Sequence, residues 1–378
     1  MPNFELNYPK KVRIGDITVR DGFQHEEIFI PTDAKVFYAE ELILCGIRHL
    51  EVTNFGNPNL MPQFKDAEEV LKRVRNSKKL SRAGINQDDL TLTVVTIREK
   101  SVDRAIAARK EGWGPDRCLM MVSTDEEHHF ANSGTTLPAY WEEAKRCIEK
   151  CKDVGIKMNG TVSTIWGSPI SGPTRLEDAV EFAKRWLEIG ASDVEHADHD
   201  GSAPPNQVYT YFSMVLNEIP DPSLHIAHFH VTRGWGTANV LAALQAGIVN
   251  FEATLGGLGG QPANFLDRVP VGGTGAYYYR DPNVVGLQCI EDMVVMMDEM
   301  GIETGIDVDR LLDLGTMMEK TIGRRLRSES ILNRRIPKQP REEFKRKGLA
   351  ELKKKLGEAP GQKLPAGWPE KATFKPRS

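Results

Sequence analysis

The sequence lacks the long apolar runs that a membrane protein needs. None of its apolar segments approaches the roughly 18 residues of a membrane-spanning helix. The opening stretch MPNFELNYPKKVRIGD has no apolar core of the kind found in secretory signals. We therefore expect a protein that has no membrane partner.

Cysteine is also scarce, with five in 378 residues: Cys45, Cys118, Cys147, Cys151 and Cys289. An odd and scattered set does not form a disulfide framework. Cys147 and Cys151 lie four residues apart, which places both on one face of a helix, where we expect buried free thiols. Free thiols persist in the reducing cytoplasm, and we predict that location.

The whole chain has only a small net charge, but two of its segments carry large and opposite charges. The formal charge is −4, yet residues 334–378 hold 14 Lys and Arg against 5 Asp and Glu. This segment therefore carries +9 and residues 1–333 carry −13. Six prolines and the lack of an apolar period indicate a solvated tail, packed on the acidic body or on a neighbouring subunit. Binding to an acidic ligand or to nucleic acid is the alternative for this segment, and we predict no nucleic-acid partner.

Strand-like runs alternate with helix-like runs over most of the chain. Amphipathic stretches lie near 33–46, 61–75, 100–112, 138–154, 174–190, 206–218, 236–247 and 285–300, and several end at glycine, as helices often do. The predicted strands cover 12–18, 49–55, 90–96, 117–123, 156–164, 193–198, 225–231 and 248–255.

Eight such pairs in about 250 residues predict an α/β fold, a (β/α)₈ TIM barrel, because each parallel strand needs a crossover. An open doubly wound sheet is the alternative, but DITVRDGFQ after the first strand is no glycine-rich dinucleotide fingerprint. We divide the chain into a barrel (1–305), a C-terminal helical segment (306–333) and the basic tail (334–378).

Two histidines one residue apart, in HIAHFHVTRG, are the first candidate site. His228 and His230 share one face of a strand, because successive side chains point to opposite faces. Paired imidazoles make half of a metal site; ordinary hydrogen-bonded histidines are the alternative.

Other ionisable residues gather at predicted strand ends, where barrels place their chemistry. Arg20 and Asp21 follow the first strand, and Glu51 lies in the second. His196, Asp198 and Asp200 surround the end of the sixth, and His196 and Asp198 share a face. A glycine-rich turn, LGGLGGQP, follows the eighth strand.

Three segments carry a family resemblance: ITVRDGFQHEE, LEVTNFGNPNLMPQFKDAEEVLKRV and HFHVTRGWGTANVLAALQAGIVNFEATLGGLGGQP. Together they resemble the DRE-TIM metallolyase superfamily, and within it the 3-hydroxy-3-methylglutaryl-CoA lyase-like proteins. The likeness runs through residues 11–305. It implies a divalent cation, Mg²⁺ or Mn²⁺, bound by Asp21, His228 and His230. Arg20 resembles the arginine that stabilises an enolate in this family, Asp198 its acid/base, Glu51 its active-site glutamate, and Gln24 a polar residue beside the metal.

Each of these residues also has a plain structural interpretation. Arg20 and Asp21 can form a salt bridge at the barrel end, Glu51 can be a hydrogen-bond partner, and Asp198 can cap the next helix. We expect structural roles for His196, Asp200 and His225. For His128 and His129 we expect a surface position, and contact with the substrate is the alternative. The glycine turn is either a tight corner or a flap over the substrate.

Three departures from the family pattern concern the same region. Gln261 stands where the lyases carry a catalytic cysteine, and Ala276 where they carry a ligand asparagine. Asn264, Asn283 or a water are candidates for that ligand position. Arg233 replaces part of the usual sequence after the histidine pair. We predict that Gln24, Arg233 and Gln261 bind substrate, with Arg233 facing an extra carboxylate or phosphate.

The resemblance implies a metal-dependent carbon–carbon lyase. It would cleave a 3-hydroxyacyl-CoA or a related hydroxy acid in retro-Claisen or retro-aldol fashion, with CoA as part of the substrate. A Claisen-type synthase that condenses acetyl-CoA with a 2-oxo acid is the first alternative, and a non-catalytic binding barrel is the second. We expect a homodimer.

Overall fold

The structure of this chain is a computed structural model that describes residues 8–24, 26, 28–59, 61–168, 170–199, 201–260, 264–266, 269–271, 286–336, 351 and 354. The chain divides into two compact units, residues 1–334 and 335–378. Among the described residues, no helix is both long and apolar enough to cross a membrane.

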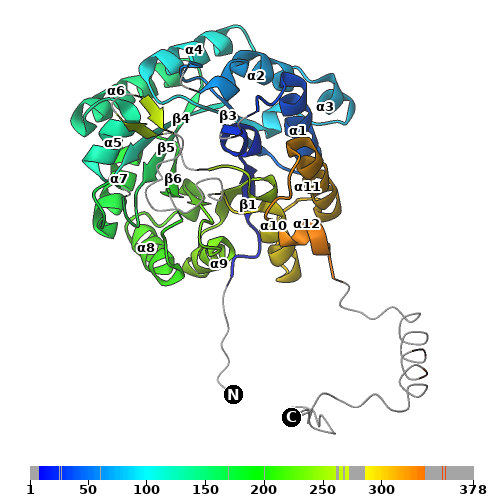
Figure 1. The fold of residues 1–378 in the computed structure, drawn as a ribbon. Coiled ribbons are helices and arrows are strands. Elements are labelled where there is room, and N and C mark those ends of the chain that lie inside the picture. Colours follow the sequence, from blue (N-terminus) through cyan, green and yellow to red (C-terminus); the bar gives the residue numbers. More distant parts are fainter. Residues whose placement is uncertain are drawn as a thin grey trace. The chain divides into compact units, whose positions relative to one another are not determined.

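Eight parallel strands close into a barrel in the first unit, each hydrogen-bonded to the next and the last to the first (Figure 1). They are β1 Arg13–Asp16, β2 His49–Asn54, β3 Thr91–Val95, β4 Arg117–Ser123, β5 Lys157–Ser163, β6 Asp193–Asp198, β7 His225–Phe229 and β8 Asn250–Ala253. Closure is set by β1 and β8, where Arg13 pairs with Asn250 and Asp16 with Ala253. The predicted barrel is confirmed, and the open sheet is excluded.

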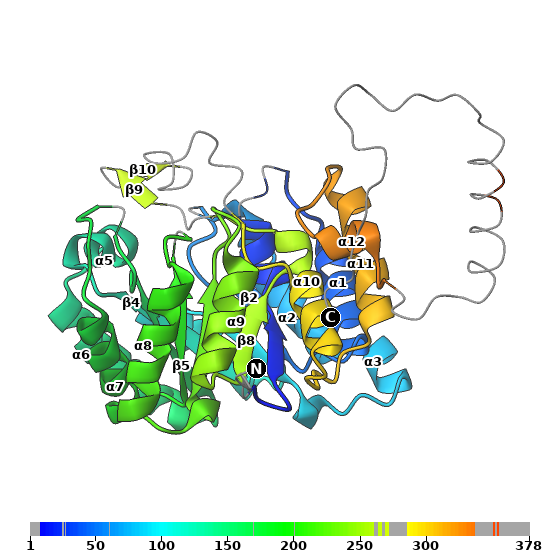
Figure 2. The same ribbon diagram turned by 90° about the horizontal axis from the view of Figure 1, so that it is seen from below.

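Helices surround the barrel and return the chain from one strand to the next, as the ring in Figure 1 shows. They are α1 Thr32–Leu44, α2 Ala67–Arg75, α3 Lys78–Arg82, α4 Glu99–Lys110, α5 Glu126–Ser133, α6 Leu137–Lys152, α7 Leu176–Glu188, α8 Pro205–Glu218, α9 Gly236–Ala246, α10 Ile290–Glu299, α11 Val308–Ile322 and α12 Glu329–Asn333. A short hairpin, β9 Asn264–Leu266 and β10 Val269–Val271, lies at the end of the barrel that carries α5 (Figure 2).

Apolar side chains hold this ring of helices against the barrel. Gly160 on β5 shows how tight the layer is, because a Cβ there would lie 2.2 Å from the ring of Trp186 on α7. Trp186 is itself fully buried, and its indole N–H donates to the carbonyl of Thr161. A larger residue at position 160 would therefore push α7 off the sheet.

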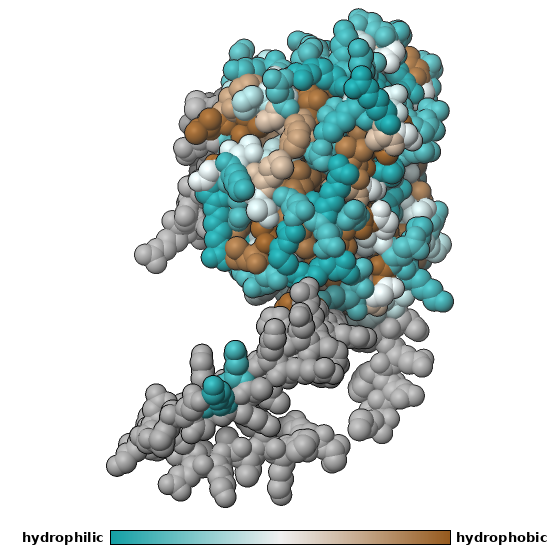
Figure 3. All heavy atoms as spheres, turned by 90° about the vertical axis from the view of Figure 1, so that its right-hand side faces the viewer, coloured by the Kyte–Doolittle hydropathy of each residue, from teal (hydrophilic) through white to brown (hydrophobic). Residues whose placement is uncertain are grey.

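The segment after the barrel belongs to the same compact unit. α11 contacts α1 and α10, and α12 contacts α10 and α11, so the stretch predicted as a helical extension packs on the barrel wall. Hydrophilic side chains are interspersed with apolar ones on the face shown in Figure 3, which is the side where Figure 1 places α1, α11 and α12. Met317 of α11 and Leu332 of α12 are exposed apolar side chains.

Candidate active site

The turn that follows β1 presents Arg20 and Asp21. Residues Thr18–Gly22 form one wide π-helical turn, in which the Gly22 N–H donates to the carbonyl of Ile17, five residues back. Such turns reshape a helix locally and are frequent at functional sites. Both side chains are 5 % exposed and lie side by side, with Arg20 Nη1 3.2 Å from Asp21 Oδ2.

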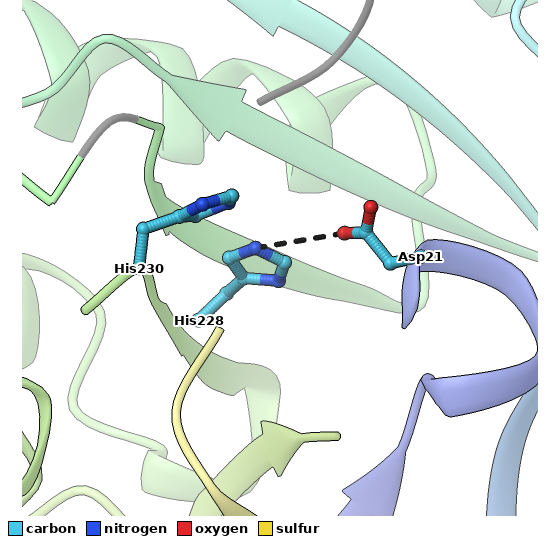
Figure 4. Close-up of side chains that lie close together, drawn as sticks. All are labelled: Asp21, His228 and His230. Carbon is cyan, nitrogen blue, oxygen red and sulfur yellow. Dashed lines mark ion pairs between the residues drawn. The ribbon is translucent and has the colours of Figure 1, made fainter. Parts of the chain in front are cut away.

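The histidine pair faces this turn across the barrel mouth. His228 lies in β7, and His230 lies just beyond the end of the strand, where it forms an antiparallel bridge with Leu287. Their ring centroids are 5.2 Å apart. Figure 4 shows both rings directed toward the carboxylate of Asp21, with His228 Nε2 3.9 Å from Asp21 Oδ2.

A carboxylate behind His228 fixes the ring. His228 Nδ1 donates to Glu252 Oε1 of β8 over 2.6 Å, and β7 and β8 pair at these two residues. This leaves His228 Nε2 directed at Asp21. A carboxylate behind a histidine in this manner orients metal-ligating imidazoles and raises their basicity.

Asp21, His228 and His230 together fit a divalent cation. Each is buried, and one ligand atom from each lies within 4.8 Å of the others. One carboxylate and two imidazoles leave further coordination positions open for substrate oxygens or water. This donor set suits a catalytic metal better than a closed structural zinc site.

Glu51 holds Arg20 beside Asp21. Arg20 Nε donates to Glu51 Oε2 over 2.5 Å, and the guanidinium makes a second, shorter contact with the same oxygen. A β-bulge between Glu51 and Thr53 interrupts the pairing of β2 with β3 at this point. Burial opposes the charge on Arg20, but Asp21, Glu51, Glu195 and Glu252 together raise its pKa above the ordinary value, so it stays a cation.

A cavity of about 540 Å³ opens above these residues. Its floor carries Arg20, Asp21, His228 and His230, and its wall runs from the loop after β2 to α4 and α5. Three cationic residues also lie on this wall: Arg98 directly before α4, and Lys100 and Arg104 within it. The cavity is large enough for a small acyl group with part of its carrier.

The side chains of β6 that face the cavity are not the ones that were predicted to form the site. Glu195, Ala197 and His199 line the cavity, and β6 pairs with β7 so that Ala197 lies beside His228. His196 and Asp198 do share a face, as predicted, but it is the opposite face. Asp198 Oδ1 accepts hydrogen bonds from the N–H groups of Ser202 and Ala203, in the turn before α8.

The outward face of β6 holds a chain of buried hydrogen bonds. His225 Nε2 donates to the carbonyl of Ile219, so its Nδ1 accepts from His196 Nε2 over 3.0 Å. His196 Nδ1 then accepts from the Tyr211 hydroxyl over 2.8 Å. Burial lowers the pKa of His196 and keeps it neutral. These contacts match the structural role that we expected for His196 and His225.

Glu195 and Glu252 form a second cluster of ionisable groups around His228. Glu195 Oε1 lies 3.6 Å from His228 Nδ1, and Glu195 Oε2 is buried with no hydrogen-bond partner in the described part of the chain. Burial first, and then neighbouring carboxylates, raise the pKa of both groups. The floor of the cavity is therefore richer in carboxylates than the predicted set of residues suggested.

The expected surface position of His128 and His129 is wrong. Both lie in α5 and are at most 1 % exposed. His128 Nε2 lies 3.0 Å from His199 Nε2, while His129 contacts Ser133 and the ring of Tyr140. Imidazoles can be buried at little cost when both ring nitrogens have partners, and the sequence alone did not show these partners.

The three predicted substrate-binding residues have separate outcomes. Gln24 lines the cavity. Arg233 is exposed; it donates to the carbonyl of Gly201 and stacks on Trp235, and it is not among the residues that line the cavity. Gln261 lies outside the described residues. So do Asp200, Ala276 and Asn283, and only the backbone of Asn264 is described.

A closed (β/α)₈ barrel with an Asp-His-His cluster and a buried arginine at its mouth is the architecture of a metal-dependent barrel enzyme. Comparison with known families identifies which family of barrel enzymes this chain belongs to. The profile of the HMGL-like family matches residues 11–318. The chain belongs to the HMGL-like family, as its motifs predicted.

Named relatives cover nearly the whole barrel. A hydroxymethylglutaryl-CoA lyase of Bacillus subtilis is 28% identical over 326 residues, 86% of this chain and 98% of the relative. An (R)-citramalyl-CoA lyase of Chloroflexus aurantiacus is 27% identical over 315 residues, 83% of this chain and 92% of the relative. The crystal structure of an HMG-CoA lyase from Acinetobacter baumannii, in complex with coenzyme A and 3-methylmalate, superposes with a TM-score of 0.75 at 28% identity, covering 90% of this chain and 99% of that one.

Proposed function

We propose that this protein is a carbon–carbon lyase that cleaves a 3-hydroxyacyl-CoA, or a related hydroxy acid, by a metal-dependent retro-Claisen or retro-aldol reaction. The observation that carries the proposal is the Asp21, His228 and His230 cluster with the Arg20 guanidinium beside it, on the floor of one cavity. The relatives support it, because they are named as lyases of branched hydroxyacyl-CoA compounds.

In this proposal the site would take Mg²⁺ or Mn²⁺, which would supply Lewis-acid polarisation of substrate oxygens. Asp21, His228 and His230 hold it, and Glu252 keeps the His228 ring in place. Gln24 lies on the same cavity wall and contacts the substrate.

Arg20 supplies the positive charge that the reaction needs. Cleavage leaves an enolate on the acyl fragment, and a fixed guanidinium stabilises its oxygen without reorganisation. Glu51 contacts Arg20 directly, so we assign it the positioning of that guanidinium. Asp198 organises the turn before α8 rather than facing the substrate.

Location and assembly belong to the same proposal. Five buried free cysteines are compatible with a cytoplasmic protein. A homodimer is the simplest assembly for a barrel of this kind. Light scattering of the purified chain measures the assembly directly; a mass other than that of two chains would contradict it.

The test begins with metal analysis and continues with two assays. The first offers 3-hydroxy-3-methylglutaryl-CoA and citramalyl-CoA and detects the carbonyl product. The second offers acetyl-CoA with 2-oxo acids and detects released thiol. We expect product only in the first assay; thiol release confined to the second would make the protein a synthase. Absence of bound metal, together with full activity of His230→Ala, would exclude the shared metal mechanism.

A further inference from the structure

A row of buried polar groups runs through the cavity wall formed by β4, β5, β6 and α5. Ser163 Oγ lies 3.0 Å from Ser123 Oγ, which lies 2.7 Å from His128 Nδ1. His128 Nε2 then lies 3.0 Å from His199 Nε2, and His199 lines the cavity. None of these four residues is more than 6 % exposed. The row therefore links two cavity-lining residues, Ser163 and His199, through the buried side chains of Ser123 and His128.

The hydrogen bonds along this row can be formed with two opposite assignments of donor and acceptor. In the first, Ser123 Oγ donates to His128 Nδ1, and His128 Nε2 donates to His199 Nε2. In the second, His199 Nε2 donates to His128 Nε2, His128 Nδ1 donates to Ser123 Oγ, and Ser163 Oγ donates to the carbonyl of Val122 over 3.2 Å. Imidazoles and hydroxyls permit both directions, because each accepts as well as donates.

The two directions differ in whether His199 Nε2 carries a hydrogen. In the first direction His199 Nε2 accepts through its lone pair. In the second it donates an N–H, which both the protonated ring and the neutral Nε2–H tautomer provide. The contact with His128 is therefore kept whether His199 is neutral or protonated, as a residue that takes up a proton and returns it requires.

We propose that His199 is the proton shuttle of the lyase, and that His128 is the residue that positions it. This rests on the proposed function. The register of β6 and β7 supports it, because Ala197 lies beside His228 and continuing that register brings His199 level with His230. His199, His228 and His230 line the same cavity.

The proton that leaves the C3 hydroxyl of the substrate returns to C2 of the same molecule. His199 takes the proton of the C3 hydroxyl, and the O–H electron pair becomes the second bond of the new carbonyl. The electron pair of the C2–C3 bond passes to the C2 enolate, whose oxygen faces Arg20. The His199 imidazolium then gives its proton to C2. The products are a carbonyl compound and the shortened acyl thioester, and no further reactant is needed.

Two measurements on the full metal-loaded chain test this role. The first is cleavage of 3-hydroxy-3-methylglutaryl-CoA and of citramalyl-CoA; the second is exchange of deuterium from D₂O into the methyl group of acetyl-CoA, the reverse of the final proton transfer. We expect His199→Ala to lower kcat and the exchange rate by roughly 10²–10⁴-fold with little change in KM. Added imidazole restores part of both rates.

His128 and His129 provide a matched pair on one helix. His128→Phe removes the contact with His199, and we expect kcat to fall about 10-fold or more at unchanged KM. His128→Gln keeps an N–H donor at the same reach and restores most of that loss. His129→Gln is the control, because His129 contacts Ser133 and Tyr140 and does not line the cavity.

The outcomes separate the two proposals. If His199→Ala or His199→Gln is folded, binds metal and keeps both rates within threefold, His199 is not the shuttle. The same conclusion follows if cleavage falls but the exchange rate does not. If the wild-type chain exchanges acetyl-CoA protons yet cleaves neither thioester, the proposed function is wrong, and the exchange rate of His199→Ala still decides the role of His199.

Discussion

The two sides of the cavity use different chemistry to keep polar groups buried. The side built from β1, β2, β7 and β8 is ionic: Arg20 lies between Asp21 and Glu51, and His228 lies against Glu252. The side built from β4, β5 and α5 is neutral: Ser123, Ser163 and His128 contact one another without a charged partner. β6 lies between them and contributes Glu195 to the first and His199 to the second.

This difference separates two tasks that would interfere with each other. A cation and a developing enolate need fixed charges, which buried ion pairs supply at a large desolvation cost. A proton in transit needs partners that can switch between donor and acceptor, and fixed charges would favour one state. The barrel places the fixed charges mainly on β1, β2, β7 and β8 and the neutral groups on β4, β5 and α5, and β6 contributes to both.

Removal of a metal ligand on the ionic side has the largest expected effect. We predict that Asp21→Ala and His230→Ala lose metal binding and lower kcat/KM by about 10⁴-fold, because three donors are the least that this site provides. Calorimetric titration with Mn²⁺ measures the binding. Tight metal binding in either variant would remove that residue from the ligand set.

Loss of the Arg20 guanidinium has the second largest expected effect on activity. We predict that Arg20→Gln retains the metal and lowers kcat about 10²–10³-fold, the usual effect of losing one oxyanion-stabilising donor. Glu51→Gln should reproduce part of this loss, because the guanidinium then loses its carboxylate partner. A fall in kcat for Glu51→Gln that exceeds the fall for Arg20→Gln would make Glu51 a reactant rather than a positioning residue.

Glu291 is a buried carboxylate that does not belong to the ionic side of the cavity. It therefore tests how a buried carboxylate behaves without a cationic partner among the described residues. It accepts the N–H of Gly256, while burial raises its pKa to about 8. The folded state thus holds its proton more tightly than the unfolded chain, and this contribution to stability is lost as the pH rises from the ordinary value toward 8. Between pH 6 and 8 the free energy of unfolding should fall by about 2–3 kcal/mol relative to Glu291→Gln.

Denaturant unfolding of both proteins across that pH range measures the difference. The matched control is Asp193, whose pKa is lowered despite its burial because Arg117 lies beside it. If the wild type and Glu291→Gln show parallel stability profiles from pH 6 to 8, then Glu291 does not hold a proton in the folded state.

The smallest effect concerns the outward face of β6. We predict that Asp198→Asn costs about 0.5–2 kcal/mol of stability, because its carboxylate accepts two backbone N–H groups before α8. We expect kcat to stay within a few-fold of the wild type. A loss of 100-fold in kcat at full thermal stability would restore the acid/base role that the family resemblance implied.

The sequence predicted the barrel well, because its signal is periodic and repeated. All eight strands fall within or close to their predicted ranges, and glycines such as Gly155 and Gly247 adopt the positive φ that ends a helix. Asp21, His228 and Arg20 were also found from motifs, and the structure brings them together.

The inner face of β6 could not be read from the sequence. Ionisable residues occupy both faces of DVEHADH, and both faces are buried, so alternation separates the two sets without saying which set points inward. Only the pairing of Ala197 with His228 decides this. His128 was missed for a related reason, because EEHHFANS is short and polar and its buried contacts come from distant strands.

The five cysteines of this chain have a practical consequence. All are free, none is more than 5 % exposed, and burial raises the pKa of Cys45 and Cys147 to about 12. Thiol reagents react with accessible thiolates, so the folded protein should give almost no background signal. Coenzyme A thiol released in the assay with acetyl-CoA and 2-oxo acids can therefore be counted directly, so even a single turnover of synthase activity would be detected. A cysteine introduced at an exposed position would be the only reactive one and would accept one dye per chain.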